Sequence, residues 1–246
     1  MRALAILPVL SLMLYPGATN AGSPIDGPIR LVLPATSPAE AELALTALAS
    51  RVERLSHPEA LRTAFEAYFR YRAARPDRVR NSYLYFVDLG LDNATPRGYV
   101  FDMDALRLVE GPFNVAHGSG SSRTRNAVPT TFSNRAGSNA SSLGLYLAQE
   151  TYEFRGTAGG LAYRSVGLRM AGESGQFNDA ARARGIVAHG APYVTASAAG
   201  RSQGCPAMEM ERAERLLPLL ANGGVVFIHS PGDARWLTAD PWINAD

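Results

Sequence analysis

After residue 80 the sequence breaks into short aromatic and β-branched segments, each bounded by glycine, proline or polar turn residues. This pattern of composition is typical of β-strands. Many short strands with few helices between them favour a β-sandwich or barrel-like core over alternating strand–helix units. We therefore predict a mostly β, α+β fold. The expected strands are 82–89, 98–102, 112–116, 143–154, 161–168, 185–188 and 224–228, with a helix at 208–220.

The segment before these strands, residues 39–78, has a different pattern. Its apolar residues recur at three- and four-residue steps, which predicts helices. His57-Pro58 interrupts the pattern, so we expect two helices, the second beginning near Pro58. The segment holds no cluster of chemically useful side chains, and we expect it to act as a scaffold.

The N-terminus has the composition of a secretory signal peptide. Arg2 supplies a positive charge, residues 3–15 form an apolar run, and small residues follow up to Ala21. The run is shorter than the ~20 residues that span a bilayer. We expect residues 1–21 to be a signal peptide and residues 22–38, rich in Gly, Pro and Ser, to be a linker. The mature protein is then exported to the periplasm or cell envelope, with no integral membrane segment.

The composition excludes several kinds of function. The formal net charge of +2 is too small to argue for nucleic-acid binding. All 24 basic residues are arginine, so no lysine amine is available for catalysis. The one cysteine rules out an internal disulfide and disfavours a cysteine-based structural zinc site. His117, His189 and Cys205 would supply three zinc ligands, but the sequence lacks HExxH-type ligand spacing. We expect no metal and no cofactor.

The segment with the clearest chemistry is residues 185–209. A short expected strand ends at His189-Gly190, and Cys205 follows sixteen residues later. A thiol needs a base or a positive charge to become a nucleophile, and an imidazole on an adjacent strand is a common solution. Gly204 allows a tight turn that exposes the sulfur, with backbone amides near a developing oxyanion. Spacing alone does not separate this dyad from two unrelated core residues.

The same segment resembles the signature of the YkuD-type L,D-transpeptidases, in which a His-Gly pair precedes a Ser/Thr-x-Gly-Cys motif. The wider sequence is similar to the murein L,D-transpeptidase catalytic-domain family, the second YkuD-like type. The resemblance covers about residues 80–230 and implies a YkuD-like catalytic domain at 79–246. The matching motifs are His189-Gly190, Ser202-Gln203-Gly204-Cys205, His117-Gly118-Ser119-Gly120, Phe132-Ser133-Asn134, Gly137-Ser138, Ser141-Ser142-Leu143-Gly144 and Gly200 through Ala207.

The resemblance implies a reaction on peptidoglycan stem peptides. Cys205 would attack the carbonyl of the third residue of a tetrapeptide stem and expel the terminal D-alanine, with His189 moving the proton. An amine acceptor then gives a 3-3 cross-link, whereas water gives an L,D-carboxypeptidase. A murein-binding protein without activity is the alternative from another class. The family needs no metal, and a carbapenem, whose strained amide mimics the scissile bond, is expected to acylate Cys205.

Two features depart from the larger family: Gln203 replaces a second histidine, and Pro206-Ala207 replaces a frequent Arg or Asn. Gln203 cannot titrate, so proton transfer would fall to His189. Arg201 would favour the thiolate or bind a substrate carboxylate. Further substrate-binding candidates, each with a structural alternative, are His117, Tyr193, Ser202, Gln203, Ser133, Asn134 and Ser142.

Overall fold

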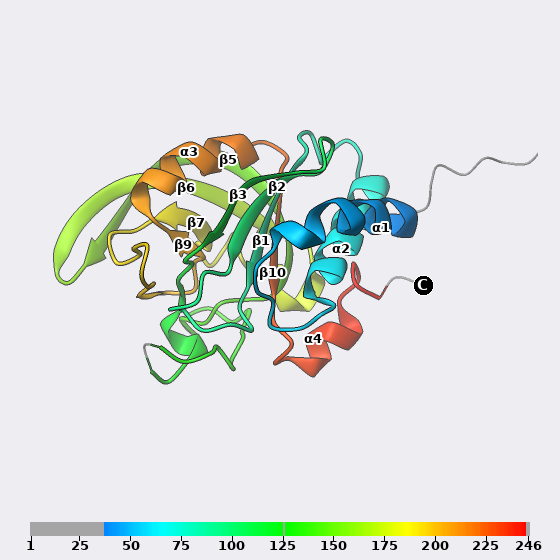
Figure 1. Cartoon of the computed structure of the whole chain (residues 1–246). Helices are drawn as coiled ribbons and strands as arrows, with labels where there is room; N and C mark the ends of the chain where they lie inside the picture. Colours follow the sequence, from blue (N-terminus) through cyan, green and yellow to red (C-terminus); the bar gives the residue numbers. More distant parts are fainter. Residues whose placement is uncertain (1–36, 125, 245–246) are drawn as a thin grey trace, which may run out of the picture. The chain divides into compact units, whose positions relative to one another are not determined.

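Within residues 37–124 and 126–244, which the computed structural model describes, eight strands form one mixed sheet and two short strands pair separately (Figure 1). The sheet order is β3-β2-β1-β10-β5-β6-β7-β9, and β4 pairs with β8. The strands are β1 Tyr83–Asp88, β2 Gly98–Asp102, β3 Arg107–Phe113, β4 His117–Gly118, β5 Gly144–Ala158, β6 Leu161–Gly172, β7 Val187–Gly190, β8 Arg201–Ser202, β9 Ala207–Met208 and β10 Val225–His229.

Four α-helices accompany the strands in the described ranges: α1 Ser37–Leu48, α2 Ala60–Ala74, α3 Met210–Leu220 and α4 Ala234–Ala239. The expected mostly β fold with helices near the N-terminus is confirmed. Within residues 37–124 and 126–244, all of these elements belong to one compact unit. The predicted signal peptide and nearly all of the predicted linker lie outside the described residues.

Helices cover both faces of the sheet. On one face, Phe65 of α2 packs edge-on against Phe101 of β2, with ring centroids 5.4 Å apart. Phe101 is the cross-strand partner of Leu84, so the next residue, Tyr85, points to the opposite face. Tyr85 stacks there on Phe113, over which an arginine of α3 lies. Because both faces are covered, β10 and nearly all of β1 are buried.

The edge strand β3 begins five residues earlier than the expected strand at 112–116. A tight turn, in which Leu106 adopts a positive φ of 47°, brings the chain back directly after β2. Pro112 lies within β3, which is compatible with an edge position because proline has no N–H to donate to a neighbouring strand.

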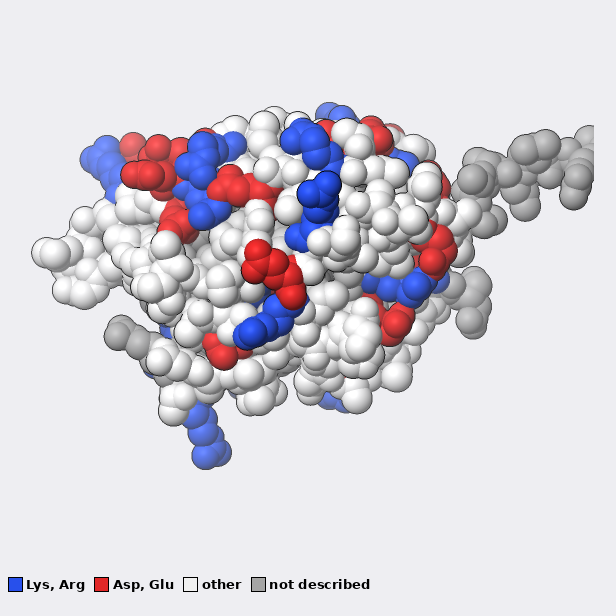
Figure 2. All heavy atoms as spheres, in the orientation of Figure 1, with Lys and Arg blue, Asp and Glu red and all other residues white. Residues whose placement is uncertain are grey.

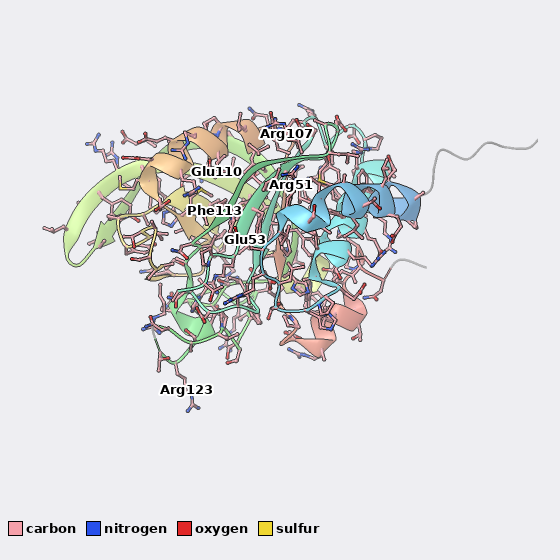
Figure 3. All side chains as sticks on the ribbon, viewed as in Figure 1. Arg51, Glu53, Arg107, Glu110, Phe113 and Arg123 are labelled. Atoms are coloured by element: carbon pink, nitrogen blue, oxygen red, sulfur yellow. The ribbon has the colours of Figure 1, made fainter. Side chains whose placement is uncertain are left out.

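Charged residues on β3 and α3 pair with one another. Glu110 on β3 (Figure 3) pairs with Arg212 of α3 and accepts a 3.0 Å hydrogen bond from Arg215. Figure 2 shows arginines interspersed with acidic residues over this face. The face therefore presents both signs of charge rather than a basic surface.

The hairpin of β5 and β6 carries part of the sheet toward the candidate site. It curves away from the rest of the sheet, in yellow-green at the left of Figure 1. Its base pairs with the core through Leu147 and Val225 of β10. Its outer half, residues 153–158 with 161–166, is paired only within the hairpin. A register shift between Ala148 and Thr151 separates the two halves.

Candidate active site

Cys205 lies in a tight turn between β8 and β9. The Ser202 hydroxyl donates to the carbonyl of Cys205 at 2.6 Å and accepts from the Gly204 N–H at 3.1 Å. Gly204 has a φ of +123°, a region that side chains strongly disfavour. A Cβ there would also stand 2.8 Å from Cδ1 of Ile186. The geometry of the turn therefore accounts for the serine and the glycine of the Ser-x-Gly-Cys motif.

The Gly/Ser-rich loop 117–142 packs directly against this turn. The Ser141 hydroxyl donates to the Gly204 carbonyl at 3.0 Å and accepts from the Gly118 N–H at 3.0 Å. Gly118 approaches so closely that a Cβ on it would lie 2.8 Å from the Gly204 Cα. The short β4–β8 ladder, which pairs Gly118 with Ser202, holds the same two segments together. These contacts fix the backbone around Cys205.

His189 reaches the site from β7, where its cross-strand partner is Ala207, two residues after Cys205. Its Nδ1 lies 2.9 Å from the Gly190 carbonyl. A carbonyl can only accept, so Nδ1 carries the proton and Nε2 is left unprotonated. Burial lowers the pKa of His189 from 6.5 to about 4, so the imidazole is neutral at neutral pH. It is therefore suited to accept a proton.

The Cys205 side chain is 9% exposed, and burial raises the pKa of its thiol. A backbone hydrogen bond from Val187 and the positive charge of Arg184 act in the opposite direction. The Cys205 sulfur also lies 3.9 Å from the Gly185 carbonyl, to which the thiol can donate. At neutral pH the Cys205 thiol and the His189 imidazole are therefore both uncharged.

Cys205 and His189 line the same cavity, which has a volume of about 850 Å³. Its wall includes three arginines, Arg155, Arg184 and Arg201, and no aspartate or glutamate among the described residues. Arg155 is paired with Glu153, at 2.7 Å. The cavity is therefore large enough for a small peptide segment and favours one that carries carboxylates.

Several predicted site residues line this cavity with Cys205 and His189: Tyr193, Arg201, Ser202 and Gln203. Arg201 also donates to the Ser122 carbonyl at 3.0 Å, which fixes its side chain against the loop. Gly190 and Gly204 shape the backbone. A Cβ on Gly190 would stand 2.2 Å from the Ser165 hydroxyl, so glycine is needed for close strand packing.

The structure places His117 away from the cavity. Its Nδ1 lies 2.8 Å from a guanidinium nitrogen of Arg97, which can only donate, so Nδ1 accepts and Nε2 donates to Ser122 at 2.7 Å. Burial, with the charges of Arg97 and Arg201, lowers the pKa of His117 to about 3. This neutral, fully bonded histidine anchors the loop.

The three remaining candidates also lie elsewhere. Ser133 and Asn134 line a second cavity of about 380 Å³, beside Phe132 and Trp236. The Asn134 amide is bonded to Asp179 and to backbone groups. Ser142 is buried and accepts a 2.9 Å hydrogen bond from the Tyr146 hydroxyl. All three make contacts that stabilise the loop.

Cavity residues that the sequence analysis did not single out include Phe154, Arg155, Tyr163 and Arg184. Phe154 stacks on His189, and Tyr163 and Tyr193 pack against the same apolar cluster. Phe154 and Tyr163 come from the outer half of the hairpin, and no local motif marks them. Arg184 stands immediately before Gly185, where the segment leading to His189 begins, and this position was the one available signal.

Residues 53–229 match the L,D-transpeptidase catalytic domain family (YkuD_2). No curated protein matches the chain. Solved structures similar to it include an L,D-transpeptidase from Mycobacterium smegmatis, with 12% identity and a TM-score of 0.36, which covers 61% of this chain and 59% of that chain.

Two further structures are similar at the same level. One is L,D-transpeptidase (Yku) from Stackebrandtia nassauensis, with 12% identity, a TM-score of 0.38, and coverage of 80% of this chain and 93% of that one. The other is L,D-transpeptidase 3 from Mycobacterium tuberculosis in complex with a faropenem-derived adduct, with 15% identity, a TM-score of 0.35, and coverage of 61% and 60%. This chain thus spans about three-fifths of the length of the mycobacterial structures. Because the family match covers well over half of the 246 residues, the chain belongs to the L,D-transpeptidase catalytic domain family.

Proposed function

We propose that this protein cleaves the L,D bond before the terminal D-alanine of a peptidoglycan tetrapeptide through a Cys205 thioester, and transfers the acyl group to an amine of a second stem. The product is a 3-3 cross-link. The observation that carries the proposal is that the single thiol and the neutral His189 ring line one cavity whose free charges are positive. A stem peptide, which bears carboxylates, is the complementary substrate.

The acylation step uses both side chains in their resting forms. As the Cys205 sulfur attacks the carbonyl carbon, its proton passes to Nε2 of His189, and a tetrahedral oxyanion forms. The Cys205 N–H makes no hydrogen bond among the described residues and is available to this oxyanion. Collapse of the intermediate breaks the C–N bond, and His189 returns the proton to the departing D-alanine amine.

The second half reverses the proton movements. The acceptor amine attacks the thioester and loses a proton to His189, and the thiolate leaves with the proton that His189 then returns. Water in place of the amine gives a tripeptide by the same route. No metal is needed in either half, and among residues 37–124 and 126–244 no three His, Cys, Asp or Glu side chains are grouped to hold one.

The proposed location is the periplasm or cell envelope, where the substrate is found. This part of the proposal rests on the signal-peptide pattern of residues 1–21. No helix of the described residues has the length and apolar character needed to cross a membrane.

The test is a product analysis. The mature protein and Cys205→Ala are each incubated with purified disaccharide-tetrapeptide, and the products are identified by mass spectrometry. We expect a cross-linked dimer and released D-alanine from the mature protein and neither from the variant. Tripeptide alone would assign an L,D-carboxypeptidase. Unchanged tetrapeptide, bound without turnover, would overturn the proposal in favour of a murein-binding protein.

A further inference from the structure

Arg184 links the Gly/Ser-rich loop to the segment that leads into β7. Its Nη1 donates to the Ser133 carbonyl at 2.7 Å and to the Ser142 hydroxyl at 3.3 Å. Its Nη2 donates to the Ala140 carbonyl at 2.8 Å and to the Ser138 hydroxyl at 3.2 Å. All four acceptors belong to residues 133–142, so this one side chain bonds to both ends and to the middle of that loop segment.

All of those acceptors are neutral, and Arg184 forms no ion pair among the described residues. The nearby Arg182 differs, because it is exposed and pairs with Glu150 at 3.1 Å. A half-buried cation without a counter-ion is costly to desolvate. Arg184 also lines the cavity with Cys205. Its charge is thus uncompensated at the place where the proposed reaction develops negative charge.

The N–H groups of Arg184 are almost all engaged in hydrogen bonds, so few remain to bind a substrate. Its four Nη–H groups are matched by the four loop acceptors, which leaves only the Nε–H. Bidentate binding of a substrate carboxylate would require breaking the loop contacts. The side chain therefore acts on the site through its charge and through the loop.

Two other arginines line the same cavity: Arg155 is paired with Glu153, and Arg201 donates to the Ser122 carbonyl. The positive charge of Arg184 lowers the pKa of the Cys205 thiol, against the effect of burial. His189 is neutral at neutral pH, because burial lowers its pKa to about 4. Four tyrosines also interact electrostatically with the sulfur and stay neutral because burial raises the pKa of each: Tyr146, Tyr152, Tyr163 and Tyr193.

We propose that Arg184 is a positioning residue of this site, which fixes loop 133–142 against the Cys205 turn and stabilises the negative charge that forms on the sulfur. The proposal rests on Cys205 being the nucleophile of the proposed function. It assigns to Arg184 two roles at once, the anchoring of loop 133–142 and a positive charge that acts on the Cys205 sulfur.

The test is the pH dependence of Cys205 alkylation by iodoacetamide, which needs no substrate. Wild type, Arg184→Gln and the matched control Arg182→Gln are compared, with thermal melts to show that each is folded. We expect Arg184→Gln to raise the pH midpoint of the alkylation rate by about one unit and to slow alkylation at pH 8 by about tenfold. Arg182→Gln should keep the wild-type profile. A wild-type profile in folded Arg184→Gln overturns the proposal.

Arg184→Lys provides the second variant, and it decides the question if Arg184→Gln does not fold. Lysine keeps the charge but cannot reproduce the four-point contact. We expect a nearly wild-type alkylation midpoint together with faster proteolytic cutting between residues 133 and 142. A raised midpoint, or unchanged protection of the loop, contradicts the proposal. Stem cleavage by the wild type is assayed in parallel, so a failed role for Arg184 is distinguished from a failed substrate assignment.

Discussion

The imidazole of His189 lies parallel to the ring of Phe154, with ring centroids 4.0 Å apart and an interplanar angle of 14°. Phe154 belongs to the outer half of the β5–β6 hairpin, whereas His189 belongs to β7. The contact places a hydrocarbon surface against one face of the proposed base. It contributes to the burial that lowers the pKa of His189 to about 4.

Replacing Phe154 by alanine should therefore raise the pKa of His189 toward its ordinary value of 6.5, because water gains access to the ring. The measurement is an NMR titration of the His189 imidazole in the variant and the wild type. Leu161→Ala is the control, since Leu161 lies at the hairpin tip and is 76% exposed. An unchanged His189 pKa in Phe154→Ala would show that other groups exclude water from the imidazole ring.

Gly204→Ala should abolish activity and destabilise the fold by about 1–3 kcal/mol, because the backbone strain adds to the contact with Ile186. The control is Gly159→Ala in the hairpin turn. Its φ is also positive, at +58°, but a Cβ there meets nothing within 4 Å. Urea unfolding and stem cleavage are measured for both. Equal losses of unfolding free energy and of stem cleavage in the two variants would mean that the close contact at Gly204 is unimportant.

Acid should destabilise the protein below about pH 6.5. The pKa values of His189 and His117 in the folded state, about 4 and about 3, are lower than the unfolded value of 6.5. The unfolded chain therefore binds more protons as the pH falls, and the stability present above pH 6.5 is progressively lost. The expected loss at pH 5 is about 2 kcal/mol for each histidine. Urea unfolding at pH 7 and pH 5 measures it.

The same unfolding experiment on His117→Gln separates the two histidines. Glutamine does not titrate, so the difference between pH 7 and pH 5 should fall by about half. A pH dependence equal to that of the wild type would mean that His117 is not held neutral in the folded protein. The variant should keep the alkylation profile of Cys205, because His117 lies away from the cavity.

A carbapenem should form one covalent adduct with the protein. Opening of the strained ring lets the Cys205 sulfur attack an amide that needs no separate leaving group, and the cationic cavity suits the carboxylate of the inhibitor. Intact mass spectrometry measures the adduct, with Cys205→Ala as the control. The absence of an adduct alongside active stem cleavage would show that the cavity excludes the bicyclic ring.

The sequence predicted the elements better than their arrangement. Most strands could be located from the sequence, because aromatic and β-branched composition and flanking turn residues are local properties. The insertion of β10 between β1 and β5 was not predictable, since it pairs Leu84 in parallel with Val225 across more than half of the chain. Such pairing depends on packing against both faces at once, which no local pattern encodes.

The site was predicted unevenly for the same reason. His189 and Cys205 stand in a recognisable motif, and the structure brings both to one cavity. His117 was a candidate because its residue type suggests chemistry, but its role depends on the buried Arg97, which the sequence does not connect to it. The contacts of Phe154 and Arg184 depend on how the hairpin and the loop pack in the folded chain, so the sequence did not predict them.

The self-paired outer half of the β5–β6 hairpin forms one wall of the cavity without sharing backbone pairing with the other strands. Lengthening or shortening both strands by two residues beyond Tyr152 would preserve which side chains face inward, because facing repeats every second residue. The register of β10 and the buried sheet would be untouched. A change in hairpin length would thus reshape one wall of the cavity while leaving the Cys205 turn in place.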